Sequence, residues 1–344
     1  MVDQSAAASA THTAPTLEQV AKRAGVSRST ASRAINGGLR VSPAAMRSVA
    51  AAVDDLGYTP NRAARSLVTR RTDSVALVVP EPDDRVLSDP FFAGVLNGVS
   101  AALAESDLQL VLILARPHET DRTARYLRSG HVDGAIVVSH HRDDSIDRVL
   151  EVSRLPSVYI GRPLTFRRPA ALIDTDNIGG GRLATQHLID RGRRRIGTIA
   201  GPADMSAGLD RLDGWREALT AAGLAADAVV RGDFTIDGGA AAAREILTRH
   251  PDLDALFIAS DLMAAGALTV LAEFGRDVPG DIAVVGYDNS GIASTTSPNL
   301  TTIAQPIVAM ARAAAEELVH QLHGRTPRSS PLIFPPELIT RGSA

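Results

Sequence analysis

Short apolar runs rich in β-branched residues recur along the chain, and amphipathic stretches of helical length separate them. The first four runs are SVALVVP, LQLVLILA, DGAIVVS and PSVYIG. The alternation begins again with ALIDTD and continues through RIGTIAGP, ALFIAS and DIAVVGYD. Strands that alternate with helices in this way form parallel sheets covered by helices on both faces. The pattern therefore predicts two doubly wound α/β lobes of similar size.

Polar and aromatic residues follow several of the predicted strands. Asp174 ends ALID, Phe234 ends VVRGDF, Asp288 ends VVGYD, and Arg211 opens the predicted helix RLDGWREAL. Ligands of doubly wound sheets bind beyond the carboxyl ends of the strands, so two lobes would place these residues around one cleft. Carboxylates and a guanidinium bind pairs of sugar hydroxyls, and an aromatic ring stacks on the apolar face of a pyranose. We therefore expect a neutral, hydroxyl-rich ligand.

Each of these residues also has a structural alternative. An Asp directly after a strand commonly caps the next helix, and this is the interpretation that we favour for Asp261. Phe234 could belong to the core. Arg211 could form a surface ion pair with Asp213 or Glu217, which would contribute little to stability.

The segment GVSRSTASRAINGG, residues 25–38, predicts a helix with a polar face. It contains two arginines, four hydroxyl side chains and an asparagine, but no Asp, Glu, Cys or His. This composition fits neither acid–base catalysis nor metal ligation, whereas it suits a polyanion. At helical spacing, one face carries Ala31, Ala34 and Ile35, and another carries Arg28, Ser29, Arg33 and Asn36.

Two further helices flank this segment. Ser27 is the expected N-cap of the central helix, and the preceding helix would bury Leu17, Val20, Ala21 and Ala24. The third helix would start after Ser42 with Pro43 in its first turn, end at Gly57, and carry the apolar stripe Met46, Val49, Val53 and Leu56. Residues 16–57 therefore predict a three-helix domain that contains a helix-turn-helix.

Charge is distributed unevenly along the chain. Residues 1–71 carry ten Lys or Arg and four Asp or Glu, a balance of +6, while the whole chain is at −3, which leaves −9 on residues 72–344. An isolated basic helix face is most often a solvated surface. A basic module on an acidic body is instead typical of nucleic-acid binding by that module.

The stretch TLEQVAKRAGVSRSTASRAINGGLRVSPAAMRSVAAAVDDLGYTPNRAARSL resembles the DNA-binding headpiece of the lactose repressor/galactose repressor family. The similarity continues through DPFF, DTDNIGGGRLATQHLIDRGRRRIGTIAGP, RLDGW, SDLMAAGAL, VVGYDN and LTTIAQP, and so extends from about Thr16 to Arg341. The resemblance implies an N-terminal all-α helix-turn-helix headpiece. It also implies an α/β body of two doubly wound parallel-sheet lobes, like that of the periplasmic binding proteins.

The resemblance also implies a division of the chain. Residues 1–15 would be a disordered tail, 16–59 the helix-turn-helix domain and 60–72 a hinge helix. The N-terminal lobe would comprise 73–173 and 304–332, and the C-terminal lobe 174–303 and 333–341. The chain would thus cross between the lobes near residues 173, 303 and 333, and closure of the lobes on a ligand is the expected response.

Functional residues follow from the same resemblance, position by position. The DNA-binding residues would be Thr16, Ser27, Arg28, Ser29, Thr30, Arg33, Asn36, Asn61, Arg62 and Leu67, with Arg28 and Ser29 as the variable base-contacting pair and Leu67 as a minor-groove wedge. The effector cleft would be lined by Phe91, Phe92, Asp174, Arg211, Phe234, Ser260 and Asp288. Gly161 stands where some sugar-binding members have an acid, and Ser260 replaces a common Asn, so the identity of the sugar does not carry over.

Other motifs predict neither catalysis nor a cofactor. GGGR at 179–182 lacks the spacing of a phosphate-binding loop and more readily allows close helix packing. His140 and His141 are adjacent, so on a strand they would point in opposite directions, which disfavours a metal site. The absence of cysteine excludes disulfides and thiolate metal ligands. We therefore expect no catalytic residues, no metal and no cofactor.

These features predict a sequence-specific transcriptional regulator, a repressor of sugar-utilisation genes. A small sugar in the interlobe cleft would release it from a pseudo-palindromic operator. Its partners would be operator DNA, that effector and a second copy of the chain, because the C-terminal ELITRGSA offers no leucine-heptad tail for a tetramer. No signal peptide or membrane-length apolar run is present, so a cytoplasmic location without membrane contact is expected. The alternative is a sugar-binding protein or sugar enzyme with the same two-lobed body.

Overall fold

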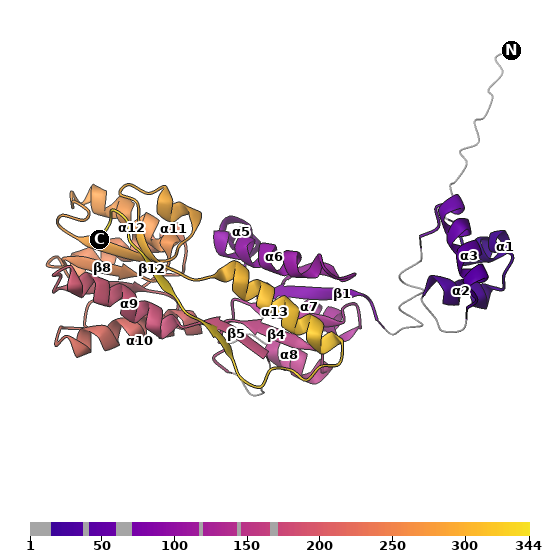
Figure 1. Ribbon diagram of the computed structural model, residues 1–344. Helices are drawn as coiled ribbons and strands as arrows, with labels where there is room; N and C mark the ends of the chain where they lie inside the picture. The colour runs from indigo at the N-terminus through magenta and orange to yellow at the C-terminus, as the bar shows by residue number, and fades with distance from the viewer. Residues whose placement is uncertain (1–14, 37–40, 60–70, 117–119, 143–145, 166–170) are drawn as a thin grey trace, which may run out of the picture. The chain divides into compact units, whose positions relative to one another are not determined.

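The computed structural model describes residues 15–36, 41–59, 71–116, 120–142, 146–165 and 171–344. The chain forms two compact units, Met1–Thr72 and Asp73–Ala344. Figure 1 shows the three helices of the N-terminal unit and the two lobes of the C-terminal unit. Of the expected tail at residues 1–15, only Pro15 is among the described residues. Residues 60–70 of the expected hinge helix also lie outside the described residues.

The N-terminal unit contains the three predicted helices. Helix α1 spans Leu17–Ala24, α2 spans Arg28–Ile35 and α3 spans Pro43–Leu56. Their small core consists of Val20, Ala21, Ala31, Val49 and Ala52. The predicted stripe of α3 was wrong at Met46, which is 49% exposed, whereas Ala52, which the stripe did not include, is buried in the core.

Polar caps define the ends of these helices. The Ser27 hydroxyl accepts a hydrogen bond from the Thr30 backbone N–H, and the Ser42 hydroxyl accepts one from that of Ala45. Gly57 ends α3 in the left-handed conformation, with a φ of 60°, which glycine adopts without strain. The predicted roles of Ser27, Ser42 and Gly57 are therefore confirmed.

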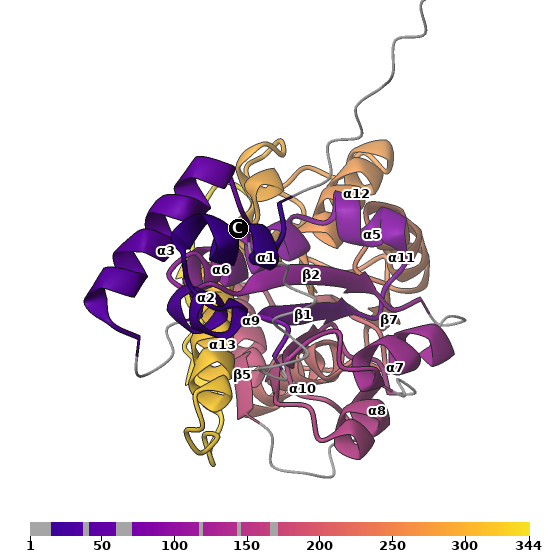
Figure 2. The ribbon, with the colours of Figure 1, turned by 90° about the vertical axis from the view of Figure 1, so that its right-hand side faces the viewer.

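The first lobe of the C-terminal unit is built on a parallel six-stranded sheet in the order β11-β5-β4-β3-β1-β2. Its strands are β1 (Ser74–Val79), β2 (Gln109–Leu114), β3 (Gly134–Val138), β4 (Ser157–Ile160), β5 (Ala171–Thr175) and β11 (Leu332–Phe334). One face packs against α6 (Pro90–Leu103) and α13 (Ile307–Leu322), and the other packs against α7 (Thr120–Arg128) and α8 (Ile146–Ser153). Figure 2 shows α6 and α7 on opposite sides of this sheet.

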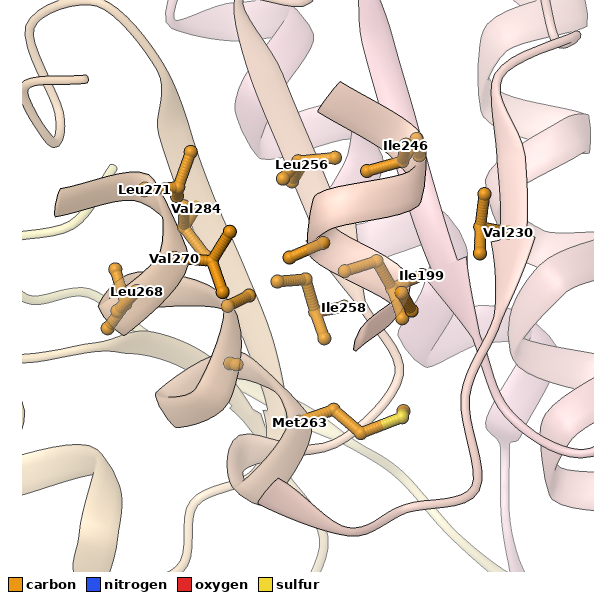
Figure 3. Close-up of a cluster of buried hydrophobic side chains, with 14 of the residues drawn as sticks. Ile199, Val230, Ile246, Leu256, Ile258, Met263, Leu268, Val270, Leu271 and Val284 are labelled. Atoms are coloured by element: carbon orange, nitrogen blue, oxygen red, sulfur yellow. The ribbon is translucent and has the colours of Figure 1, made fainter. Parts of the chain in front are cut away.

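The second lobe repeats this plan with the sheet order β12-β10-β9-β8-β6-β7, in which only β12 pairs antiparallel. Its strands are β6 (Ile196–Ala200), β7 (Val229–Arg231), β8 (Ala255–Ile258), β9 (Ala283–Asp288), β10 (Thr301–Ala304) and β12 (Glu337–Ile339). Helices α11 (Ile236–Arg249) and α12 (Asp261–Glu273) cover one face, and α9 (Asn177–Asp190) and α10 (Ser206–Ala221) cover the other. Figure 3 shows Leu256 and Ile258 of β8 packed beside Ile246 and Val270 of the covering helices.

Two local expectations differ from the structure. The segment ALIDT forms β5, which pairs with β4 in the first sheet, so the second alternation begins with α9 rather than with this strand. Arg211 was expected to open its helix, but α10 (Ser206–Ala221) begins five residues earlier, and SAGLD forms its first turn. Arg211 therefore lies in the second turn of α10 and its side chain is buried.

The glycine-rich start of α9 permits a close crossing with α10. A Cβ atom at Gly181 would clash with the backbone carbonyl oxygen of Arg211, and one at Gly214 would clash with that of Ile178. The predicted packing role of GGGR is therefore confirmed. This crossing fixes the backbone that carries Arg211.

Candidate ligand pocket and nucleic-acid surface

A pocket of about 740 Å³, its open mouth included, lies between the two lobes at the carboxyl ends of their strands. Each of the seven residues expected at the effector cleft lines this one pocket: Phe91, Phe92, Asp174, Arg211, Phe234, Ser260 and Asp288. The topology thus brings together residues that are separated by up to almost two hundred positions in the sequence. Both polar groups and aromatic rings face the enclosed space, as in sites for small polar ligands.

Arg211 is held by a buried network at the base of the pocket. Its side chain donates from Nε to Oδ1 of Asn177 at 2.9 Å and from Nη1 to the backbone carbonyl of Ala259 at 2.7 Å. Its guanidinium carbon lies 3.6 Å from the ring centre of Tyr287. Arg211 is only 5% exposed, so these contacts hold the guanidinium in one orientation.

The surface ion pair considered for Arg211 was wrong. Asp213 instead pairs with Arg216, and Glu217 with Arg182, all four on exposed parts of α9 and α10. The second turn of α10 faces the pocket, so Arg211 points away from both of these acids. Its charged neighbour is Asp288, with Nη1 3.4 Å from Oδ1.

Two carboxyl groups flank this network. Asp288 accepts a hydrogen bond from Nε2 of Gln305 at 2.7 Å, and burial raises its pKa although the nearby Arg211 opposes the shift. Asp174 accepts from the backbone N–H groups of Thr175 at 2.8 Å and Arg162 at 3.1 Å, and burial raises its pKa to about 6. Both groups can accept hydrogen bonds from ligand hydroxyls while the surrounding backbone fixes their position.

Aromatic rings form the apolar part of the pocket lining. Phe91 and Phe92 meet edge to face with ring centres 5.2 Å apart, on the first turn of α6. Phe234 belongs to the core of the second lobe and also lines the pocket, so the two interpretations of this residue are compatible. The guanidinium groups of Arg85 and Arg211 lie 5.9 Å and 5.8 Å from its ring centre.

The start of α12 differs from the expectation. Ser260, not Asp261, caps the helix, with its hydroxyl accepting from the Met263 backbone N–H at 3.3 Å. The carboxylate of Asp261 turns into the lobe, where it accepts from the backbone N–H of Ser290 at 2.7 Å and from the hydroxyl of Thr302 at 2.6 Å. The capping interpretation of Asp261 was therefore wrong: the residue anchors the loop after β9 and the start of β10.

The pocket also contains polar residues that the sequence did not single out for it. Asn177 and Gln305 follow β5 and β10, and their amides orient Arg211 and Asp288. His140 follows β3 and lines the pocket, whereas His141 contacts Glu81 and Asp204. Each of these residues follows the carboxyl end of a strand, and that position was the available signal. Among the described residues, no cluster of His, Cys, Asp or Glu fits a metal ion.

The N-terminal unit exposes one face of α2. Arg28, Ser29, Arg33 and Asn36 are exposed, and Thr30 is partly buried. Arg28 Nε lies 3.1 Å from a carboxylate oxygen of Glu18 on α1, although α2 itself carries no acid. This free helix face presents the donors and acceptors that base edges and phosphates require.

The remaining residues expected to bind DNA fall into two groups. Thr16 and Ser27 cap α1 and α2, so their backbone N–H groups lie at helix N-termini, where phosphates bind favourably. Asn61, Arg62 and Leu67 lie outside the described residues. Over the part of the chain that the structure describes, no helix combines the length and apolar character needed to cross a membrane.

Comparison with known proteins decides the family. Residues 16–61 match the model of bacterial regulatory proteins of the lacI family, and residues 185–344 match a periplasmic binding protein-like domain. The HTH-type transcriptional regulator CelR of Thermobifida fusca is 51% identical over 333 residues, which cover 96% of this chain and 98% of CelR. The chain belongs to the LacI family.

Other LacI-family proteins are similar over the same length. The ribose operon repressor of Escherichia coli K12 is 34% identical and covers 96% of the chain, with 99% of its own length matched. A solved complex of CelR with cellobiose has a TM-score of 0.78 and 48% identity, over 96% of this chain and all of that one. The lac repressor dimer bound to operator and an anti-inducer has a TM-score of 0.84 and 25% identity, over 96% and 99% of the two chains.

The LacI-family assignment confirms the predicted fold and function class. The chain is a DNA-binding transcriptional regulator with a helix-turn-helix unit and a two-lobed α/β body. The relatives named above are regulators of transcription, so the comparisons do not favour a sugar-binding protein or a sugar enzyme.

Proposed function

We propose that this protein represses sugar-utilisation genes and leaves its operator when a sugar binds between the lobes. The observation that carries the proposal is the buried network of Arg211, Asn177 and Asp288 at the base of the interlobe pocket. Its fixed guanidinium and carboxyl groups match pairs of sugar hydroxyls, and the rings of Phe91, Phe92 and Phe234 offer apolar faces to a pyranose. We assign effector binding to these residues and to Asp174 and Ser260.

Cellobiose is the first candidate for the effector. The relative with 48% identity was solved in complex with this disaccharide, and the match covers 96% of this chain.

Operator recognition is assigned to the exposed face of α2. Arg28 and Ser29 open this helix and would read base edges, while Thr16, Ser27, Thr30, Arg33 and Asn36 would position it on the DNA. Asn61, Arg62 and Leu67 would complete the contact. A homodimer would place two such helices on the half-sites of a pseudo-palindromic operator in the bacterial cytoplasm, where that DNA is found.

We assign no enzymatic activity to the pocket. Its acids are held by backbone and amide donors rather than by a paired acid and base, and Arg211 is committed to fixed partners. This arrangement suits a site that binds a ligand and releases it without chemical change.

Three measurements test the proposal. Calorimetry with cellobiose, glucose and ribose should show that cellobiose binds most tightly, and a turnover screen with the same sugars should show no product. A gel-shift selection from random DNA should yield a pseudo-palindromic sequence. Turnover of a sugar without DNA binding would reject the regulator in favour of an enzyme.

A further inference from the structure

His140 is a pocket residue with an unused hydrogen-bonding atom. It follows β3, lines the pocket, and is only 6% exposed. Its Nε2 atom is buried and has no hydrogen-bond partner among the described residues. Buried polar atoms in folded proteins nearly always have a partner, so an unpaired nitrogen in the lining of a ligand site calls for one.

The surroundings of His140 fix the ring without using Nε2. Its ring centre lies 5.1 Å from that of Tyr159, with the two planes inclined at 42°. Gly161 also lines the pocket, and the nearest atom to a Cβ placed there would be Cδ2 of His140, 4.0 Å away. Cδ2 is bonded to Nε2, so this edge of the imidazole lies beside Gly161, a pocket residue without a side chain.

The charge state of His140 limits the chemistry of its partner. Burial is the main cause that lowers its pKa to about 3; His141 acts in the same direction, and backbone hydrogen bonds at Ile160 and Val137 act against it. The imidazole is therefore neutral near pH 7, and Nε2 is either a single donor or a single acceptor. A hydroxyl group satisfies both forms, because it donates and accepts.

A second buried nitrogen nearby has the same need. The Nε atom of Arg85 is buried without a partner among the described residues, although Nη1 of the same side chain donates to Glu81 at 2.8 Å. Arg85 also lines the pocket, and its Nε–H can only donate. The first lobe thus offers the pocket a donor and a neutral imidazole, a pair that fits oxygen atoms of an uncharged polyol.

We propose that Nε2 of His140 forms a hydrogen bond with a hydroxyl group of the sugar and so contributes to the specificity of the pocket. This inference rests on the proposed function, in which a sugar is the effector. It gives the two adjacent histidines different roles: His140 faces the ligand, and His141 contacts an acid of the second lobe. It also supplies a polar contact from the first lobe opposite Arg211.

An unpaired Nε2 alone does not distinguish a ligand contact from a tolerated defect. His187 also has a buried, unpaired Nε2, but it does not line the pocket. His187 is therefore the matched control, because replacing it removes the same chemistry at a site without ligand. His140→Phe and His187→Phe both retain an aromatic ring, so packing is largely kept in each.

Calorimetry with cellobiose and with its singly deoxygenated derivatives tests the inference. His140→Phe should weaken cellobiose binding about tenfold, the loss expected when one buried hydrogen bond is removed. His187→Phe should leave the affinity within about twofold. His140→Gln, whose amide nitrogen can occupy the position of Nε2, should recover part of the loss and remains informative where the Phe variant folds poorly.

The deoxygenated sugars separate a direct contact from a structural effect. One derivative should bind more weakly than cellobiose to the unchanged protein but equally well to His140→Phe, because the contact that it lacks is already gone. Losses that simply add for every derivative, or an unchanged affinity of His140→Phe, would overturn the inference while leaving the sugar-binding function intact. Failure of the unchanged protein to bind any of these sugars would instead overturn the proposed function and this inference with it.

Discussion

His141 in the first lobe lies 2.8 Å from Asp204 in the second, measured between Nδ1 and Oδ2. Its other ring nitrogen lies 3.1 Å from Oε1 of Glu81, which belongs to the first lobe and is almost completely buried. A second ion pair, between Arg162 and Asp210, also joins the lobes, with donor–acceptor distances of 2.7 and 2.9 Å. These contacts hold the lobes together next to the pocket that both of them line.

Removing the charge of Asp204 should weaken effector binding. A ligand that contacts both lobes binds more tightly when other contacts already favour their closed arrangement. Because Asp204 is half exposed, its ion pair is worth about 0.5–1 kcal/mol, so we expect Asp204→Asn to raise the dissociation constant of cellobiose about twofold to fivefold. Calorimetry measures this change. Asp213→Asn is the control, because it breaks an exposed ion pair within α10 and should leave the affinity for cellobiose unchanged. Equal affinities of the two variants would show that the interlobe contact does not support effector binding.

The same histidine predicts a dependence of stability on pH. The hydrogen bond to Glu81, together with that to Asp204 and against the effect of burial, raises the pKa of His141 to about 9. A raised pKa stabilises the folded state below the unfolded pKa of about 6.5, and this contribution is lost as the pH rises through about 9. Urea unfolding at pH 7 and pH 10 measures how far the free energy of unfolding decreases as the pH rises. This decrease should be about 2–3 kcal/mol smaller in His141→Gln than in the unchanged protein. Parallel pH profiles of the two proteins would contradict this assignment.

Arg211→Ala should produce a repressor that no longer responds to its effector. Removing charged hydrogen bonds of roughly 1.5–3 kcal/mol should weaken cellobiose binding about tenfold to over a hundredfold. Because Arg211 is buried beside Asp288, the variant should also unfold at lower urea concentration. Operator affinity without sugar should remain close to that of the unchanged protein. Anisotropy titrations of labelled operator measure both properties, and normal release by cellobiose would exclude Arg211 as a ligand contact.

Arg28 should determine base preference at one position of each half-site. A bidentate contact to guanine contributes about 1–3 kcal/mol of discrimination, and Arg28→Ala should lose it at that position alone. Glu18→Gln is the matched variant, because it removes the acid that now pairs with Arg28 while keeping the arginine. It should retain the base preference. Uniform weakening of Arg28→Ala on all sequences would show a phosphate contact instead.

The sequence predicted the elements of this protein better than the orientation of their side chains. Short uninterrupted apolar runs located inner strands of the two sheets, which are buried on both faces, and apolar residues at helical spacing located the three N-terminal helices. The rule for helix caps failed for Asp261. Its partners Ser290 and Thr302 are distant in sequence and become its neighbours only through the order of strands in the sheet. A local rule for caps cannot anticipate such contacts.

The two histidines show a second limit of sequence reasoning. Adjacency in the sequence predicted that the two side chains would point in different directions, but it did not reveal that the ring of His140 would lie in the pocket and that of His141 between the lobes. That outcome depends on the turn after β3, where Ser139 adopts a φ of 63°, and on the position of Asp204 in the other lobe. Resemblance to a family singled out seven positions that line the interlobe pocket, while the neighbours that orient them required coordinates.

Release of operator DNA by cellobiose would show that sugar binding between the lobes controls DNA binding. Full-length protein bound to a fluorescent operator, selected from random DNA, is titrated with cellobiose while anisotropy is recorded. We expect the anisotropy to fall to that of free DNA over the concentration range in which calorimetry shows sugar binding. Anisotropy that stays constant while the sugar saturates the pocket would contradict it, since binding of the sugar would then not be coupled to release of the DNA.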